Sequence, residues 1–85
     1  MPDAGYYQAL AAGIVRLLRE ARERRSLSKY AVSQRSGVSQ SMLSLVERGL
    51  RNPTMELMLR IADAIGVDLA EIIKRARQEV SKPAK

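Results

Sequence analysis

The side chains best suited to specific chemistry lie on one face of a short helix that we predict between residues 39 and 48. Four of them recur at the i, i+3, i+4 and i+7 positions that share a helix face: Ser41, Ser44, Leu45 and Arg48. Gln40 lies beside them in the first turn. Glutamine can form two hydrogen bonds with adenine, and serine can donate or accept at several base edges. The face therefore predicts recognition of base edges, with an ordinary solvated helix face as the alternative.

The distribution of charge favours a polyanionic partner. The 85 residues include 15 Lys and Arg against 9 Asp and Glu, which gives a net charge of +6. No acidic residue lies between Glu23 and Glu47, and this stretch holds four basic residues: Arg24, Arg25, Lys29 and Arg35. A surface that meets phosphate should lack carboxylates, because each one repels the charge of a nucleic-acid backbone.

The composition also excludes several kinds of enzyme chemistry. The chain has no His and no Cys, so imidazole bases, thiolate nucleophiles and the common nitrogen and sulfur metal ligands are missing. Its carboxylates are scattered and form no evident pair, so we expect no catalytic residue, no metal and no cofactor. No apolar run approaches the ~18 residues of a membrane span, and the N-terminus lacks a signal-peptide pattern. We therefore expect a cytoplasmic protein with no membrane partner.

Helical periodicity and capping signals together predict an all-α chain of five helices. Four residues are suited to capping a helix start: Ser28, Ser39, Thr54 and Asp68. Three glycines, each followed by an apolar residue, have the signature of a left-handed helix end: Gly37, Gly49 and Gly66. The expected helices cover residues 6–25, 28–36, 39–48, 54–65 and 68–79. Gly13 weakens the first of them, so a separate turn over residues 6–12 is an alternative.

These elements predict one domain, residues 1–80, followed by a disordered tail, residues 81–85. The second and third helices are separated only by Gly37, Val38 and Ser39, an arrangement typical of a helix-turn-helix over about residues 28–48. Ser33 provides the small side chain that a close helix crossing needs. Apolar residues stand where the two helices must pack: Val32, Val38, Leu43 and Val46.

The spacing of these pieces resembles the Cro/repressor (Xre) helix-turn-helix family, which includes lambdoid phage repressors and the controller proteins of restriction–modification systems. The resemblance covers roughly residues 14–73 and rests on several short motifs: Leu27-Ser28-Lys29, Ser36-Gly37-Val38-Ser39-Gln40-Ser41, Glu47-Arg48-Gly49, Arg51-Asn52-Pro53, Ile61-Ala62 and Gly66-Val67. It implies a compact five-helix, lambda-repressor-like domain, a homodimer, and insertion of the third helix into the major groove of double-stranded DNA.

The resemblance also implies roles for individual residues. The positions that match base-contacting residues of the family are Gln40, Ser41, Ser44 and Leu45. The positions that match phosphate-contacting residues are Lys29, Ser39, Arg48, Arg51 and Asn52. Arg22 and Glu47 match a structural ion pair between the first and third helices. The chain departs from the usual pattern at Lys29 and Leu45, where Gln is common, and at Ser33, where Ala is customary. Leu45 either touches a thymine methyl group or packs on Leu50 at the helix end.

A dimer needs a second surface, for which the last two helices offer apolar candidates. We expect it to include Leu57, Val67, Leu69, Ile72 and Ile73, with the segment from Tyr6 to Leu10 as a further candidate. Leu57 is expected to be exposed between core positions Met55 and Leu59. We also expect three methionines in the core or at its edge: Met42, Met55 and Met58.

The sequence therefore predicts a dimeric, sequence-specific DNA-binding transcriptional regulator, acting as a repressor or autoregulator on a near-palindromic operator. No effector pocket is evident, and the chain is too short for a separate ligand-binding domain, so we expect no small-molecule effector. The alternative is a helix-turn-helix module that binds a protein, for example as an antitoxin-type partner. Binding that ignores ionic strength would favour that alternative.

Overall fold

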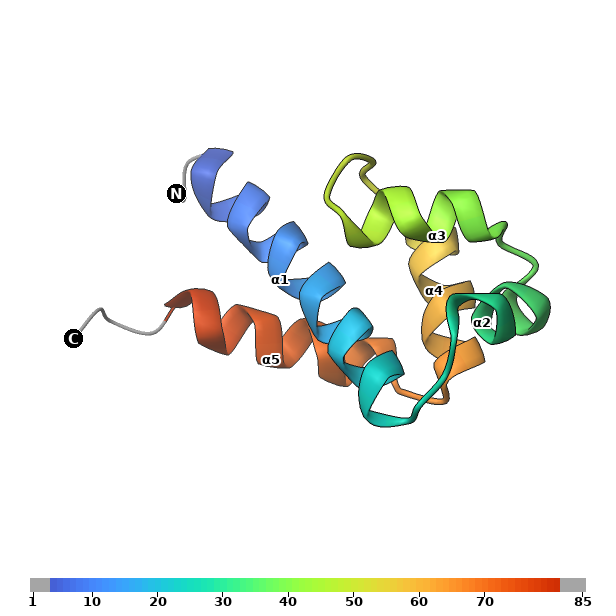
Figure 1. The fold of residues 1–85 in the computed structure, drawn as a ribbon. Coiled ribbons are helices and arrows are strands. Elements are labelled where there is room, and N and C mark those ends of the chain that lie inside the picture. Colours follow the sequence, from blue (N-terminus) through green and yellow to red (C-terminus); the bar gives the residue numbers. More distant parts are fainter. Residues whose placement is uncertain (1–3, 82–85) are drawn as a thin grey trace.

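The computed structural model describes residues 4–81, which form five α-helices and no strand (Figure 1). The predicted all-α architecture with a helix-turn-helix is confirmed, and each helix lies within a few residues of its expected range. In chain order the helices are α1 (Ala4–Arg24), α2 (Lys29–Ser36), α3 (Gln40–Glu47), α4 (Met55–Ile65) and α5 (Leu69–Ser81). Ser81, expected in the tail, is the last residue of α5, and residues 82–85 lie outside the described part of the chain.

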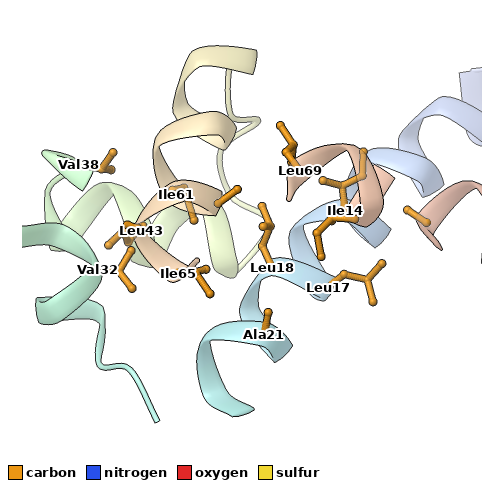
Figure 2. Close-up of a cluster of buried hydrophobic side chains, with 14 of the residues drawn as sticks. Ile14, Leu17, Leu18, Ala21, Val32, Val38, Leu43, Ile61, Ile65 and Leu69 are labelled. Carbon is orange, nitrogen blue, oxygen red and sulfur yellow. The ribbon is translucent and has the colours of Figure 1, made fainter. Parts of the chain in front are cut away.

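The core is formed by one apolar face from each helix (Figure 2). Leu17, Leu18 and Ala21 of α1 lie at its centre, where they meet α4 and α5. The residues expected between α2 and α3 are all buried: Val32, Val38, Leu43 and Val46. Burial of a large aliphatic side chain contributes about 1.5–3 kcal/mol, so this shared core fixes the position of the short α2 and α3.

The predicted starts of α2, α3 and α4 are confirmed by hydrogen bonds at their N-caps. The hydroxyls of Ser28, Ser39 and Thr54 each accept a bond, at 3.0–3.1 Å, from the backbone N–H three residues later. The carboxylate of Asp68 accepts a bond from the backbone N–H of Ala70 at the start of α5. These bonds satisfy N–H groups that have no partner inside the helix, and each cap is worth about 1 kcal/mol.

The first helix runs unbroken through Gly13, so the alternative of a separate turn over residues 6–12 is wrong. At Gly13 the helix passes close to α5, and a Cβ atom there would lie 3.7 Å from the Cβ of Ala76. Packing of α1 on α5 therefore offsets the low helix propensity of glycine, which is a local effect of only ~1 kcal/mol.

The end of α1 lies within one residue of its expected position, but its capping residue was not foreseen, because the left-handed residue is a serine. Ser26 has a φ of 54°, and its N–H bonds to the carbonyl of Glu23 while that of Leu27 bonds to the carbonyl of Arg22. This pair of bonds is the Schellman arrangement, in which the left-handed position is usually glycine. A serine there carries a steric cost that glycine avoids.

Ser26→Gly is expected to raise the free energy of unfolding by about 0.5–1 kcal/mol, because glycine adopts the left-handed conformation without strain. Urea denaturation followed by circular dichroism measures this change. The matched control is Ala70→Gly, in a helix, which should lower stability by a similar amount. Destabilisation by Ser26→Gly would contradict the strain at residue 26.

Two expectations for α4 are wrong. Met55 and Leu59 were expected in the core but are 56% and 46% exposed, whereas Leu57, expected to be exposed, is partly buried against the core with Met58. The reason is the helical repeat: Met55 and Leu59 share one face, and the opposite face of α4 is the one that meets the other helices. Apolar residues on both faces made the choice ambiguous in the sequence.

Two further features concern the surface of the described residues. No helix within residues 4–81 is long and apolar enough to cross a membrane.

A cavity of about 620 Å³ opens between the first half of α1 and the segment that follows α3. The sequence gave no sign of such a pocket, because its two walls come from segments more than 25 residues apart.

Candidate nucleic-acid interface

The turn between α2 and α3 is held by a glycine and a buried serine. Gly37 has a φ of 76°, and its N–H bonds to the carbonyl of Ser33 at 3.0 Å. Val38 then turns inward, and its N–H donates to the hydroxyl of buried Ser36 at 3.0 Å. Ser36 is a structural residue that the sequence reasoning missed. A serine directly before the glycine is the signal that was available, since such hydroxyls often satisfy nearby backbone groups.

This turn leaves one face of α3 open to solvent. Gln40 and Ser41 are exposed, whereas Ser44 and Leu45 are partly buried further along the helix. The exposed N-cap Ser39 stands at the start of the same face, and Arg48, Arg51 and Asn52 are exposed beyond its end. The residues expected to touch bases and phosphates therefore lie along one short helix and the loop that follows it.

Lys29 joins this group from α2. Its ammonium donates a hydrogen bond to the hydroxyl of Ser44 at 3.2 Å. The bond occupies one of the three protons of the ammonium and leaves the hydroxyl proton of Ser44 available to a further acceptor. A cation is thus held beside a hydroxyl on the candidate base-reading face, a contact that the sequence did not reveal.

Arg22 and Glu47 form a two-point ion pair that links the end of α1 to the end of α3. The Nε and Nη2 atoms of Arg22 donate to the two carboxylate oxygens of Glu47 at 2.8 and 2.9 Å, and Nη1 donates to the carbonyl of Leu27 at 2.8 Å. Both side chains are only 11% exposed. The hydrogen bonds to Glu47 raise the pKa of Arg22 above its usual value, so the guanidinium stays charged. This pair ties the end of α3 to α1 in addition to the apolar core.

Leu45 also takes part in the end of α3. The N–H of Leu50 bonds to the carbonyl of Leu45 at 2.9 Å, and the N–H of Gly49 bonds to that of Val46 at 3.0 Å. These are the two bonds of a Schellman motif. The side chain of Leu50 nevertheless remains 61% exposed. The end of α3 is therefore stabilised by these two backbone hydrogen bonds rather than by burial of Leu50.

Two arginines of the stretch that lacks acidic residues cover the end of α4. Arg25 donates from Nη1 to the carbonyls of Ile65 and Gly66, both at 2.9 Å, and Arg35 donates to the carbonyl of Ala64 at 3.4 Å. The last carbonyls of a helix lack partners within it and carry partial negative charge. These two arginines therefore contribute to the fold by covering the end of α4.

The contact of Arg25 predicts a difference between two glycines. A Cβ at Gly66 would lie 2.7 Å from Nη1 of Arg25, whereas a Cβ at Gly49 would meet no atom within 4 Å. Both glycines have positive φ, so alanine at either should cost about 1 kcal/mol of strain. Gly66→Ala should cost about 1 kcal/mol more by displacing Arg25. Chemical denaturation of the two variants measures this difference, and equal losses would contradict it.

The structure corrects the expected dimer surface. Leu69 and Ile72 are each only 5% exposed and belong to the core of the single chain, so they have little surface to offer a partner. They are buried because α5 packs this face against α1 and α4. Leu57, Val67 and Ile73 are partly buried at the edge of the same core.

Comparison with known proteins agrees with this architecture. A family model described as helix-turn-helix matches residues 18–72. The chain is 42% identical over 52 residues to an uncharacterized HTH-type transcriptional regulator of Sinorhizobium fredii, a match that covers 61% of this chain and 68% of the relative. It is 41% identical over 59 residues to another from Mycobacterium tuberculosis, covering 69% of this chain and 42% of that protein.

A second Sinorhizobium fredii protein of the same description is 36% identical over 56 residues, covering 66% of this chain and 29% of the relative. The matches thus span from under a third to about two thirds of the length of these relatives. No solved structure matches the chain significantly. The family match covers α2, α3 and α4 with parts of α1 and α5, which includes the whole helix-turn-helix. The chain therefore belongs to the Cro/repressor-type (Xre) helix-turn-helix family of DNA-binding transcriptional regulators.

Proposed function

We propose that this protein regulates transcription as a homodimer that inserts α3 into the major groove of a near-palindromic operator, as a repressor or autoregulator. The observation that carries the proposal is the open face of α3, where exposed Gln40 and Ser41 are followed by the cations Arg48 and Arg51. The one carboxylate of α3, Glu47, is neutralised by Arg22. Base-reading groups therefore meet the duplex without a free negative charge beside them.

We assign the contacts in two classes, since base contacts specify a sequence and phosphate contacts position the protein. Gln40, Ser41 and Ser44 read base edges, and Leu45 meets the methyl group of a thymine. A separate set binds phosphates: Lys29, Ser39, Arg48, Arg51 and Asn52. The support for this division is position, because the first set lies along α3 and the second lies at its two ends and on the start of α2.

The dimer needs a surface other than the buried residues of α5. The partly buried residues Leu57, Val67 and Ile73 remain our candidates for that surface. A two-fold dimer should place its recognition helices in successive major grooves, so the operator half-sites should lie about 10 bp apart. Selection of genomic fragments by the purified protein, followed by sequencing, tests this arrangement. Recovery of fragments without a two-fold repeat would overturn the palindromic dimer.

The base-reading role of Gln40 has a direct test. Gln40→Ala is expected to weaken operator binding by about 1–3 kcal/mol and to relax preference at one base pair of each half-site. Fluorescence anisotropy on the operator and on single-base variants measures both effects. The control is Lys29→Ala, which should weaken binding to operator and random DNA alike. Equal losses on operator and random DNA for Gln40→Ala would refute its role.

A further inference from the structure

The cavity between α1 and the segment after α3 lies beside the candidate DNA-binding face and shares Arg48, Arg51 and Asn52 with it. One wall is a single face of α1, from Tyr7 to Arg19, and the other is the loop from Arg48 to Pro53. The two walls lie on the same side of the molecule (Figure 1). At 1.5 Å per residue the α1 wall is about 18 Å long, or just over three helical turns.

Part of the lining of this groove is apolar. The apolar side chains come from α1, from the end of α3 and from α4, among them Ala11, Val15, Val46 and Met58. Tyr7, at the N-terminal end of the α1 wall, is half exposed. An apolar concave surface of this size favours a ligand that can bury apolar side chains of its own.

Both walls of the groove carry arginines. Arg16 and Arg19 belong to α1, and Arg48 and Arg51 belong to the opposite wall. Arg16 is bonded to Glu20 and Glu79, but within residues 4–81 no ion pair or side-chain hydrogen bond engages Arg19, Arg48 or Arg51. The single carboxylate in the lining, that of Glu47, is occupied by Arg22. The groove therefore offers unpaired positive charge on either side of an apolar strip.

We propose that this groove docks an acidic amphipathic helix of a partner protein. Such a helix presents an apolar stripe at i, i+3, i+4 and i+7, flanked by carboxylates on both sides. Its stripe fits the apolar part of the lining, its flanks meet the arginines of the two walls, and three turns match the length of the α1 wall. A second copy of this chain, with a net charge of +6, lacks the required charge.

Docking has a consequence for DNA binding that rests on the proposed function. Arg48, Arg51 and Asn52 line the groove and are also our candidates for phosphate contact. A helix that pairs its carboxylates with these arginines withdraws them from phosphate, so partner and operator compete. The groove is thus a site at which an acidic protein segment releases the regulator from DNA. Docking itself does not depend on this consequence and is measured without DNA.

The test uses a synthetic peptide of about 15 residues with leucines along one helical stripe and glutamates on both flanks. Two control peptides are a scrambled sequence of the same composition and a version with lysine in place of glutamate. Binding to the full chain is measured by isothermal titration calorimetry in the absence of DNA. We expect the designed peptide to bind at least ~10-fold more tightly than either control. Equal affinity for the designed and scrambled peptides would overturn the proposal.

Two variants locate the site. Ala12→Glu places bulk and a negative charge in the exposed groove lining, and it should weaken peptide binding at least ~10-fold. Ala70→Glu is the matched control, because Ala70 is exposed on α5 and does not line the groove. Thermal unfolding by circular dichroism verifies that both variants are folded. Equal effects of the two substitutions would place the peptide elsewhere and overturn the assignment of the groove.

A final titration separates docking from the proposed function. The designed peptide is added to the complex of the protein with its selected operator, and DNA release is followed by anisotropy. Displacement supports both the groove and the phosphate contacts of the loop. Peptide binding without displacement keeps the docking site and refutes the shared role of Arg48 and Arg51.

Discussion

Glu47→Ala is expected to lower the free energy of unfolding by about 3 kcal/mol, because it leaves the guanidinium of Arg22 largely buried without its partner. Arg22 makes two hydrogen bonds to Glu47 and a third to the carbonyl of Leu27, so the loss affects α1, α3 and the link before α2. Small domains are stable by only about 5–15 kcal/mol. Equilibrium denaturation in urea measures the change, and operator binding should fall only as far as the folded fraction falls.

Two controls separate the ion pair from other effects of this substitution. Glu56→Ala removes an exposed carboxylate that pairs with Arg60 one turn away, and it should change stability by less than ~0.5 kcal/mol. The double variant Arg22→Met with Glu47→Leu should recover most of the loss, because apolar residues of similar volume leave no uncompensated charge. Intact stability together with abolished operator binding in Glu47→Ala would show that Glu47 acts in recognition rather than in architecture.

Raising the salt concentration from 50 to 200 mM is expected to weaken operator binding about 10³-fold. In the proposed dimer, Lys29, Arg48 and Arg51 of two protomers neutralise about six phosphates. Each neutralised phosphate adds about 0.9 to the slope of log affinity against log salt. Anisotropy titrations at four salt concentrations give this slope. A flat dependence would favour the alternative of a protein-binding module, since release of counterions accompanies every phosphate contact.

Substitutions at two positions show which residues determine how strongly operator affinity depends on salt concentration. Arg51→Gln removes one phosphate contact from each protomer, so the slope should fall by about 2. Gln40→Ala should leave the slope unchanged while it weakens binding to the operator, because a base contact releases no counterion. An unchanged slope in Arg51→Gln would remove Arg51 from the phosphate-binding set and from the competition proposed for the groove.

Local signals in the sequence were sufficient for the order and the limits of most helices. Ser28, Ser39 and Thr54 cap helices in the structure as expected, and Gly37, Gly49 and Gly66 adopt positive φ. These interactions join residues only a few positions apart, so residue type alone indicates them. The end of α1 at Ser26 is the exception, since serine rarely takes the left-handed conformation and its type gave no signal.

The candidate interface was predictable in part for the same reason. The face of α3 follows from the helical repeat once the start at Ser39 is known, and the ion pair of Arg22 with Glu47 was expected from the family resemblance. The contact of Lys29 with Ser44 and the covering of α4 by Arg25 were not foreseen. Long basic side chains reach partners far along the chain, and their positions depend on how the helices cross.

The sequence by itself determined five helices, most of their caps, a helix-turn-helix with its apolar inner face, and the family. Only the tertiary structure decided which sides of α4 and α5 meet the core, which buried Leu69 and Ile72 and left Met55 and Leu59 exposed. It alone brought α1 and the loop after α3 together as the walls of a groove. Caps and helical repeats depend on interactions between residues that are close in the chain. Burial and cavities arise from the packing of segments that are distant in the chain.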